Sequence, residues 1–263
     1  MKLAVVSAAL LLSLGAGCSR DTGRGVKVVG STSVQPFAEL LAQEYEQRYP
    51  GKPVEVQGGG STAGLQAAAS GLADIGTCSR SLKAEEEGRF TALVIARDGL
   101  AVVVNPANPV VGLTVEQLRG LFSGQIANWK EVGGMDGPVW PITREEGSGT
   151  RESFVHLVMG EEPISRRALT QESNGAVREL VQGDSAAIGY MSLGLLTREL
   201  KALSIDGIQP SAANVVAGRY ELARPFLFVT QGAPGTEARA FIDFVLSAEG
   251  QAILQTEGLV GVR

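Results

Sequence analysis

The chain has 263 residues, 44% of them hydrophobic, and this composition is typical of a folded α/β protein rather than of a disordered or fibrous one. Its length allows one large domain or two smaller ones with separate cores. The formal net charge of −5 argues against a nucleic-acid partner, because such proteins normally carry a basic face. Any anion bound here must therefore be held by local geometry against an unfavourable overall charge.

Residues 1–17 are predicted to be a signal peptide. Lys2 precedes the apolar run LAVVSAALLLSLGAG, which has the length of a signal-peptide core and ends in small residues before Cys18. We expect Cys18 to be lipidated, although Gly15 stands where the lipobox usually has leucine, and cleavage without lipidation is the alternative. Residues 18–25 would form a polar tether. The sequence thus predicts export to the periplasm or cell surface, with the lipid as the only membrane attachment.

Three strand–turn–helix units place Ser or Thr at the start of a helix. Residues 26–30, 54–57 and 139–144 are predicted strands, and the turns after them read STS, GGGST and EEGSGT. A helix N-terminus leaves backbone N–H groups unpaired and carries partial positive charge, so it favours an anion. Capping alone would explain the hydroxyl residues of one such turn. Three of these turns, with Arg144 beside the third, favour a shared anion site.

The remaining segments indicate two lobes. GLAVVVNPANP at 99–109 and YELARPFLFVT at 220–230 are β-rich and are predicted to cross between the lobes. Between them, a capping box from Thr114 to Gln117 predicts a helix, and NGAVRELVQG predicts another before the strand-like AAIGYMS. Two crossing strands would form a hinge. The predicted lobe I comprises residues 26–104 and 224–263, and lobe II comprises residues 105–223.

Other functional motifs fail in detail. GGGSTAG has only part of a dinucleotide fingerprint, no nucleotide P-loop is present, and residues 147–149 lack the G-x-S-x-G spacing of a serine hydrolase. His156 is the only histidine, and Cys78 is the only cysteine after Cys18, so neither a metal cluster nor an internal disulfide is expected. The sequence therefore predicts no catalytic residue, no metal and no cofactor.

An ordered set of motifs resembles a known family. GSTSVQPFAE, GGGSTAG, ADIGTCSR, REEGSGTRESF, NGAVRE and AIGY occur in the order found in bacterial phosphate-binding proteins of ABC importers, across nearly the whole chain after the signal peptide. The chain is most similar to the shorter members. The resemblance implies the periplasmic-binding-protein fold, with two α/β lobes and a two-strand hinge. It also implies a monomer that binds inorganic phosphate, passes it to the transmembrane subunits of an ABC permease and catalyses no reaction.

The resemblance also assigns residues to the phosphate site, position by position. Hydroxyl groups come from the first two turns and the DIG-x-x-S segment, and the opposite lobe adds an arginine with its Ser-Gly-Thr turn. A dehydrated anion needs a nearly complete shell of donors, and these residues provide many neutral ones with a planar guanidinium. The predicted phosphate-binding residues are Thr32, Ser33, Ser61, Ser79, Arg80, Arg144, Ser148, Gly149 and Thr150.

One position departs from the family pattern. Longer members have, after the equivalent of Ser79, an aspartate that accepts the phosphate proton and so rejects sulfate, but this chain has Arg80 there. Asp74, Glu145 and Glu146 are candidate substitutes for that aspartate, and Glu146 could instead pair with Arg144. A receptor for sulfate or molybdate is therefore an alternative. A phosphoester hydrolase with the same anion cradle, and an adhesin or sensor, are further alternatives.

Overall fold

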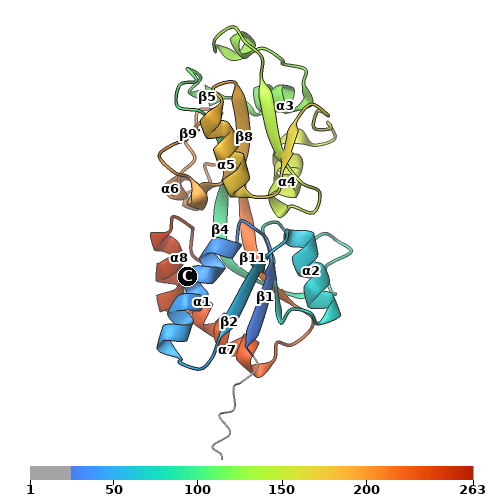
Figure 1. Cartoon of the computed structure of the whole chain (residues 1–263), viewed down its shortest axis with the longest axis vertical. Helices are drawn as coiled ribbons and strands as arrows, with labels where there is room; N and C mark the ends of the chain where they lie inside the picture. Colours follow the sequence, from blue (N-terminus) through green and yellow to red (C-terminus); the bar gives the residue numbers. More distant parts are fainter. Residues whose placement is uncertain (1–24, 263) are drawn as a thin grey trace, which may run out of the picture.

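The computed structural model describes residues 25–262, which form two lobes stacked along the long axis (Figure 1). The predicted signal peptide, Cys18 and nearly all of the tether lie outside the described residues. Within residues 25–262, no helix combines the length and apolar character needed to cross a membrane. Strands β4 (Thr91–Val104) and β11 (Ala223–Thr230) pass between the lobes, as the predicted two-lobed α/β fold requires.

Lobe I, the lower half of Figure 1, contains a parallel sheet covered by helices. Its elements, besides the crossing strands, are β1 (Val26–Gly30), α1 (Gln35–Arg48), β2 (Val54–Gly58), α2 (Ser61–Ser70), β3 (Ile75–Cys78), α7 (Thr236–Val245) and α8 (Ala248–Thr256). Strand β1 lies between β2 and β3 and is parallel to both. The turns that follow these three strands therefore lie at the same edge of the sheet, which faces lobe II (Figure 1).

Lobe II, the upper half of Figure 1, is built around β6 and β8. Its strands are β5 (Gly112–Leu113), β6 (Trp140–Arg144), β7 (Leu169–Gln171), β8 (Ala187–Ser192), β9 (Lys201–Ala202) and β10 (Ser204–Ile205). Its helices are α3 (Val115–Ser123), η1 (Trp129–Val132), α4 (Gly149–Phe154), the π-helical η2 (Val155–Met159), α5 (Asn174–Gly183), η3 (Leu193–Leu195) and α6 (Ala212–Val216). Both hydrogen bonds of the predicted capping box at the start of α3 are present.

Strand β4 connects the lobes through a single sheet with the order β2-β1-β3-β11-β4-β8-β6-β7. It pairs antiparallel with β11 and, farther along its length, with β8. The strand predicted to begin at Gly99 begins at Thr91, and the added residues include the buried Asp98. The lobe boundaries at residues 104 and 224 stay a prediction.

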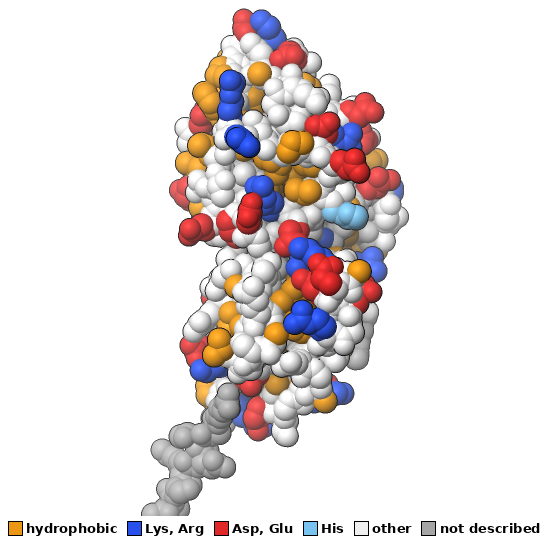
Figure 2. Space-filling view, turned by 90° about the vertical axis from the view of Figure 1, so that its right-hand side faces the viewer, with side chains coloured by type: hydrophobic (Ala, Val, Ile, Leu, Met, Phe, Trp, Pro, Cys, Tyr) orange, Lys and Arg blue, Asp and Glu red, His pale blue; other side chains and the backbone are white. Residues whose placement is uncertain are grey.

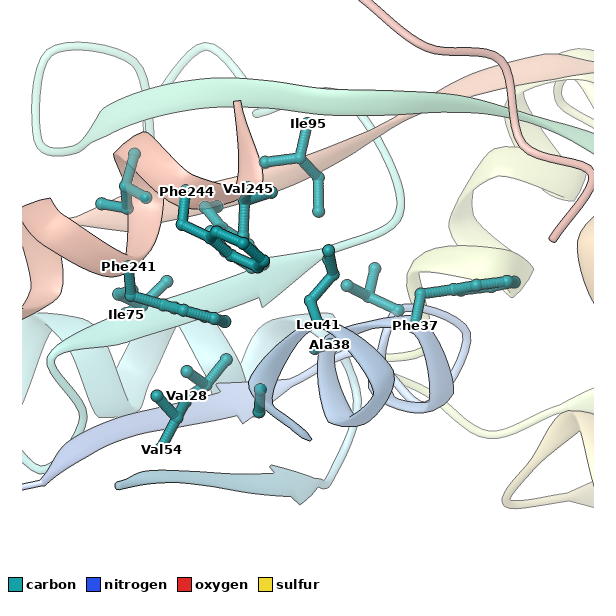
Figure 3. Packing of buried hydrophobic residues seen from close by; sticks show 14 of the residues in the cluster. Val28, Phe37, Ala38, Leu41, Val54, Ile75, Ile95, Phe241, Phe244 and Val245 are labelled. Carbon is teal, nitrogen blue, oxygen red and sulfur yellow. The ribbon is translucent and has the colours of Figure 1, made fainter. Parts of the chain in front are cut away.

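Each lobe has its own apolar core. In lobe I, Val28 and Ile75 of the sheet pack against Phe37 and Leu41 of α1 and Phe241 of α7 (Figure 3). Burial of each such side chain stabilises the fold by about 1.5–3 kcal/mol. In lobe II, the rings of Phe154 and Tyr190 stack 4.0 Å apart, which ties α4 to β8. The turns that face each other between the lobes are therefore each attached to a packed apolar core.

Candidate anion-binding site

Three turns of lobe I bring uncharged hydroxyl groups together at the sheet edge. Ser31 Oγ donates a hydrogen bond to Ser79 Oγ (2.9 Å), and the Ser79 N–H donates to Ser61 Oγ (3.1 Å). Ser31, Ser33, Ser61 and Ser79 are all buried, with exposed fractions of 2% or less. A hydroxyl can both donate and accept, so this cluster can solvate an anion without adding charge.

The Ser-Gly-Thr turn of lobe II lies directly against these hydroxyl groups. Ser148 caps α4 by accepting a backbone N–H, and Thr150 Oγ1 lies 2.8 Å from Ser33 Oγ in the opposite lobe. A Cβ atom added at Gly149 would lie 2.2 Å from Ser61 Oγ, so a larger residue would collide there. The two lobes are thus closed on each other at this turn.

Arg144, at the end of β6, brings the predicted guanidinium to the cluster. Its Nε and Nη2 each donate to the Glu145 carboxylate at 3.0 Å. Nη2 also donates to Thr32 Oγ1 across the cleft at 3.0 Å. The side chain is 1% exposed, and its Nη1 has no hydrogen-bond partner among residues 25–262. A buried N–H group without a partner is costly, so Nη1 is available to an anion.

Arg224 is a second buried guanidinium beside the cluster, and the sequence analysis missed it. Its Nε and Nη2 donate to Asp98 Oδ2 at 3.1 and 3.0 Å, and Nη2 also donates to Ser33 Oγ at 3.3 Å. Asp98 is its cross-strand neighbour on β4 and accepts a further bond from Ser192 Oγ. Nη1 of Arg224 has no hydrogen-bond partner among the described residues. The geometry at Arg224 therefore repeats that at Arg144.

Asn174, at the start of α5, completes the hydroxyl network. Its Nδ2 donates to Ser33 Oγ at 2.9 Å, and its Oδ1 accepts the Ser192 N–H at 3.1 Å. The motif NGAVRE was recognised in the sequence, but its first residue was not assigned to the site. The sequence did offer a signal for Asp98 and Arg224. Each is a charged residue in an apolar, β-rich segment, and a buried charge requires a partner.

Burial makes the positive charge of Arg144 and of Arg224 unfavourable without an anion. Desolvation lowers the pKa of Arg144 and of Arg224, although the neighbouring carboxylates of Glu145 and Asp98 act in the opposite direction. The charge of Arg144 lowers the pKa of Arg224 further, because the two cations repel each other. A bound anion would relieve both penalties.

Arg80 makes no hydrogen bond to this cluster. Its Nη1 and Nη2 donate to the two oxygens of Glu86 at 2.7 and 2.9 Å, and its Nε lies 3.0 Å from Glu152 Oε2. Burial acts against its charge, but the hydrogen bonds that it donates to Glu86 and the charge of Glu152 outweigh this and raise its pKa. The ligand role predicted for Arg80 therefore has no supporting contact in the structure.

The candidate proton-accepting carboxylates are placed differently from one another. Asp74 accepts the Lys27 N–H at the opposite end of the sheet from the hydroxyl cluster. Glu146 is exposed, and Glu145, not Glu146, holds Arg144. Among residues 25–262, no group of three or more His, Cys, Asp or Glu residues could hold a metal ion. The arrangement offers clustered hydrogen-bond donors that suit a small anion.

Comparison with known proteins agrees with this arrangement. Residues 16–249 match the family described as the PBP superfamily domain. The chain belongs to the PBP superfamily. It is 33% identical over 235 residues to the phosphate-binding protein PstS of Bacillus subtilis, with 88% of this chain and 78% of that protein covered. It is 28% identical over 258 residues to PstS of Borreliella burgdorferi, covering 93% of this chain and 92% of that protein. The predicted membership among phosphate-binding proteins is confirmed.

Solved structures extend the likeness to the fold. A phosphate ABC transporter substrate-binding protein of Clostridium perfringens, crystallised with bound phosphate, is 37% identical with a TM-score of 0.89, covering 91% of this chain and all of that one (100%). An ABC-type phosphate transport receptor from Vibrio cholerae is 38% identical with a TM-score of 0.76, covering 89% and 99%. The two-lobed periplasmic-binding-protein fold predicted from the motifs is thereby confirmed.

Proposed function

We propose that this protein binds inorganic phosphate outside the cytoplasm and delivers it to the transmembrane subunits of an ABC permease. The observation that carries the proposal is the pair of buried guanidinium groups beside the hydroxyl cluster. Each is held by a carboxylate, and the Nη1 of each has no partner among the described residues. The relatives named above are phosphate-binding proteins, which supports the same ligand. The protein acts as a receptor and catalyses no reaction.

The proposed phosphate shell combines the predicted residues with those that the structure adds. Closure of the lobes brings its two halves together around the anion, and opening releases it. The hydroxyl, amide and backbone donors orient the oxygens, while Arg144 and Arg224 provide charge-assisted hydrogen bonds. The proposed ligands are Ser31, Thr32, Ser33, Ser61, Ser79, Arg144, Ser148, Gly149, Thr150, Asn174 and Arg224.

Helix N-termini supply the remaining positive charge. Glu145 and Asp98 offset the charges of the two arginines, so these side chains alone leave the site neutral. Site residues lie just before or within the first turns of α1, α2 and α5, and each of these helices contributes roughly +0.5 charge at its N-terminus. Dipoles and uncharged donors thus stabilise a dianion inside a protein whose net charge is negative.

Export, membrane attachment and lobe movement are part of the proposed function. The signal peptide at 1–17 directs export, Cys18 carries the lipid, and residues 18–25 tether a monomeric receptor to the membrane. Residues 26–104 and 224–263 move as one lobe against residues 105–223. Mass spectrometry of the protein extracted from its own membranes would test the lipid, because an unmodified Cys18 contradicts that part of the proposal.

Calorimetric titration tests the ligand. Residues 19–263, freed of carried-over anion, are titrated with phosphate and then with sulfate as competitor. Tight one-to-one phosphate binding is expected, with sulfate displacing phosphate only at much higher concentration. Equal binding of both anions would indicate a broader oxyanion receptor. Binding of neither, or cleavage of a chromogenic phosphate ester that Ser148→Ala abolishes, would contradict the receptor function.

A further inference from the structure

Outside the hydroxyl cluster, an ion-pair network joins the two lobes. Glu152 of α4 lies in lobe II, and its Oε2 contacts Arg80 Nε at 3.0 Å and Lys83 Nζ at 2.6 Å, both in lobe I. Basic and acidic side chains gather at the waist between the lobes, just below His156, the only histidine (Figure 2). The network borders a cavity of about 450 Å³ that both lobes line. Opening of the lobes would break these two contacts.

Arg80 is held for this contact from within its own lobe. Glu86 occupies the two terminal nitrogens of the guanidinium, and Ser81 accepts a further hydrogen bond from Nη1. This fixes the group, which is 5% exposed, so that its Nε edge faces Glu152. The contact with Glu152 is an ion pair without hydrogen-bond geometry, and Lys83 reinforces it.

Glu152 lies on the helix whose first turn meets the anion site. Gly149 and Thr150, at the start of α4, pack against lobe I, and Ser153 Oγ donates to Ser79 O across the cleft at 3.2 Å. Attraction of Glu152 to lobe I therefore presses the start of α4 onto the hydroxyl cluster. Contacts that exist only in the closed form slow its opening.

We propose that Arg80 and Lys83, through Glu152, form a latch that holds the lobes closed and slows release of the bound anion. This inference rests on the proposed function for its ligand. The latch makes Arg80 a residue that determines affinity through closure, without contact with phosphate. It also explains why a basic residue follows Ser79 in a site whose charge is already balanced.

Two variants each remove one negative charge. Glu152→Gln removes the partner of Arg80 and Lys83 in the opposite lobe. Glu85→Gln removes an exposed carboxylate of lobe I that forms no ion pair within residues 25–262. Radiolabelled inorganic phosphate, chased with excess unlabelled phosphate, gives the dissociation rate of each. We expect Glu152→Gln to release phosphate about fivefold faster than wild type, at the upper end for a partly exposed ion pair. Glu85→Gln should change the rate less than twofold, and high salt should bring wild type close to Glu152→Gln.

The sign of the effect separates the latch from simple electrostatics. Glu152 is a negative charge on the first turns of α4, so its removal would slow release if repulsion of the anion dominated. An unchanged or slower release from Glu152→Gln would overturn the latch. Equal acceleration by Glu85→Gln would overturn it too, because the effect would then follow the net charge of the protein and not the contact between the lobes.

Small-angle scattering tests the latch without phosphate. In phosphate-free buffer of low ionic strength, wild type should have a smaller radius of gyration than Glu152→Gln. Added salt should remove the difference. Equal radii at low salt would overturn the latch. Failure of wild type to bind phosphate would refute the proposed function instead, and the scattering result would still decide the latch.

Discussion

Two buried arginines, Arg80 and Arg224, hold carboxylates by different edges of the guanidinium group. Asp98 takes the Nε and Nη2 edge of Arg224, Nη2 also contacts Ser33, and Nη1 has no partner within residues 25–262. Glu86 takes the terminal nitrogens of Arg80 and leaves only Nε. Nη1 of Arg224 keeps two N–H groups for an anion, whereas Nε of Arg80 has a single N–H, and that nitrogen faces Glu152. The edge that the carboxylate occupies therefore decides whether a buried arginine can bind a ligand.

The carboxylate partners of the two arginines also differ in their exposure to solvent. The Arg224–Asp98 side chains are 1% and 0% exposed, whereas those of Glu86 and Glu152 around Arg80 are 15% and 21% exposed. Water can replace a lost partner at Arg80 more easily than at Arg224. Loss of the Arg224–Asp98 pair should therefore lower both the unfolding free energy and the phosphate affinity. Loss of the Arg80 contacts should mainly weaken closure of the lobes.

The largest expected effect is that of Arg224→Met, which removes one partner of a fully buried ion pair. Asp98 is left without its counter-ion, and removal of one buried partner costs about 3–5 kcal/mol. Desolvation already raises the pKa of Asp98, and without Arg224 the carboxylate will take up a proton more readily. Urea denaturation should show this loss of unfolding free energy, and phosphate binding should be lost.

The double variant Asp98→Asn/Arg224→Met separates stability from binding. It removes both charges, so most of the unfolding free energy should return. Phosphate affinity should stay at least about tenfold below wild type, because the guanidinium donors are still missing. Wild-type affinity in the double variant would show that Arg224 is not a ligand.

The next largest effect is that of Arg144→Ala, which should weaken phosphate binding at least about tenfold. Its partner Glu145 is 26% exposed and can be rehydrated, so the variant should unfold less readily than Arg224→Met. Calorimetric titration and urea denaturation measure the two properties. Glu145→Gln, which retains the arginine, is the matched control and should bind more tightly than Arg144→Ala. Unchanged affinity in Arg144→Ala would place the site elsewhere.

Much of the fold could be predicted because its signals are local. The Thr114 capping box identified the start of α3. The turns after β1, β2 and β6 were located by their glycine and hydroxyl residues. The start of β4 was missed, because Asp98 interrupts the apolar pattern that marks a buried strand.

The candidate site was predictable only where it follows the chain. Thr32, Ser61 and Ser148 lie in the turns after recognisable strands, so the repeated strand–turn–helix pattern marked them as candidates. Arg224 and Asp98 are 126 positions apart and meet through the register of β11 and β4, which no local pattern encodes. Position beside Ser79 suggested a ligand role for Arg80, but Glu86 and Glu152 orient its side chain instead.

A moderate effect is expected for Arg80→Gln, and it tests whether Arg80 reads the anion. Because Arg80 makes no hydrogen bond to the hydroxyl cluster, the variant should weaken phosphate and sulfate binding by one common factor, below about tenfold. The ratio of the two dissociation constants, from competition titrations, should equal that of wild type. A changed ratio would mean that Arg80 faces the ligand and contributes to selectivity.

The smallest effect concerns the pH dependence of the Arg80–Glu86 pair. Burial acts to raise the pKa of Glu86, but hydrogen bonds from Arg80 and the Lys83 N–H outweigh it and lower that pKa below its ordinary value of 4.5. The unfolded chain therefore binds this proton more readily than the folded one. The stabilisation by Glu86 is present above the ordinary pKa and is lost as the pH falls through the lower folded value. Wild type should exceed Glu86→Gln by about 1 kcal/mol in unfolding free energy near neutral pH, and less in acid. A difference that grows on acidification would show that the ionised carboxylate destabilises lobe I, and Arg80 would then need another contact to hold its Nε edge toward Glu152.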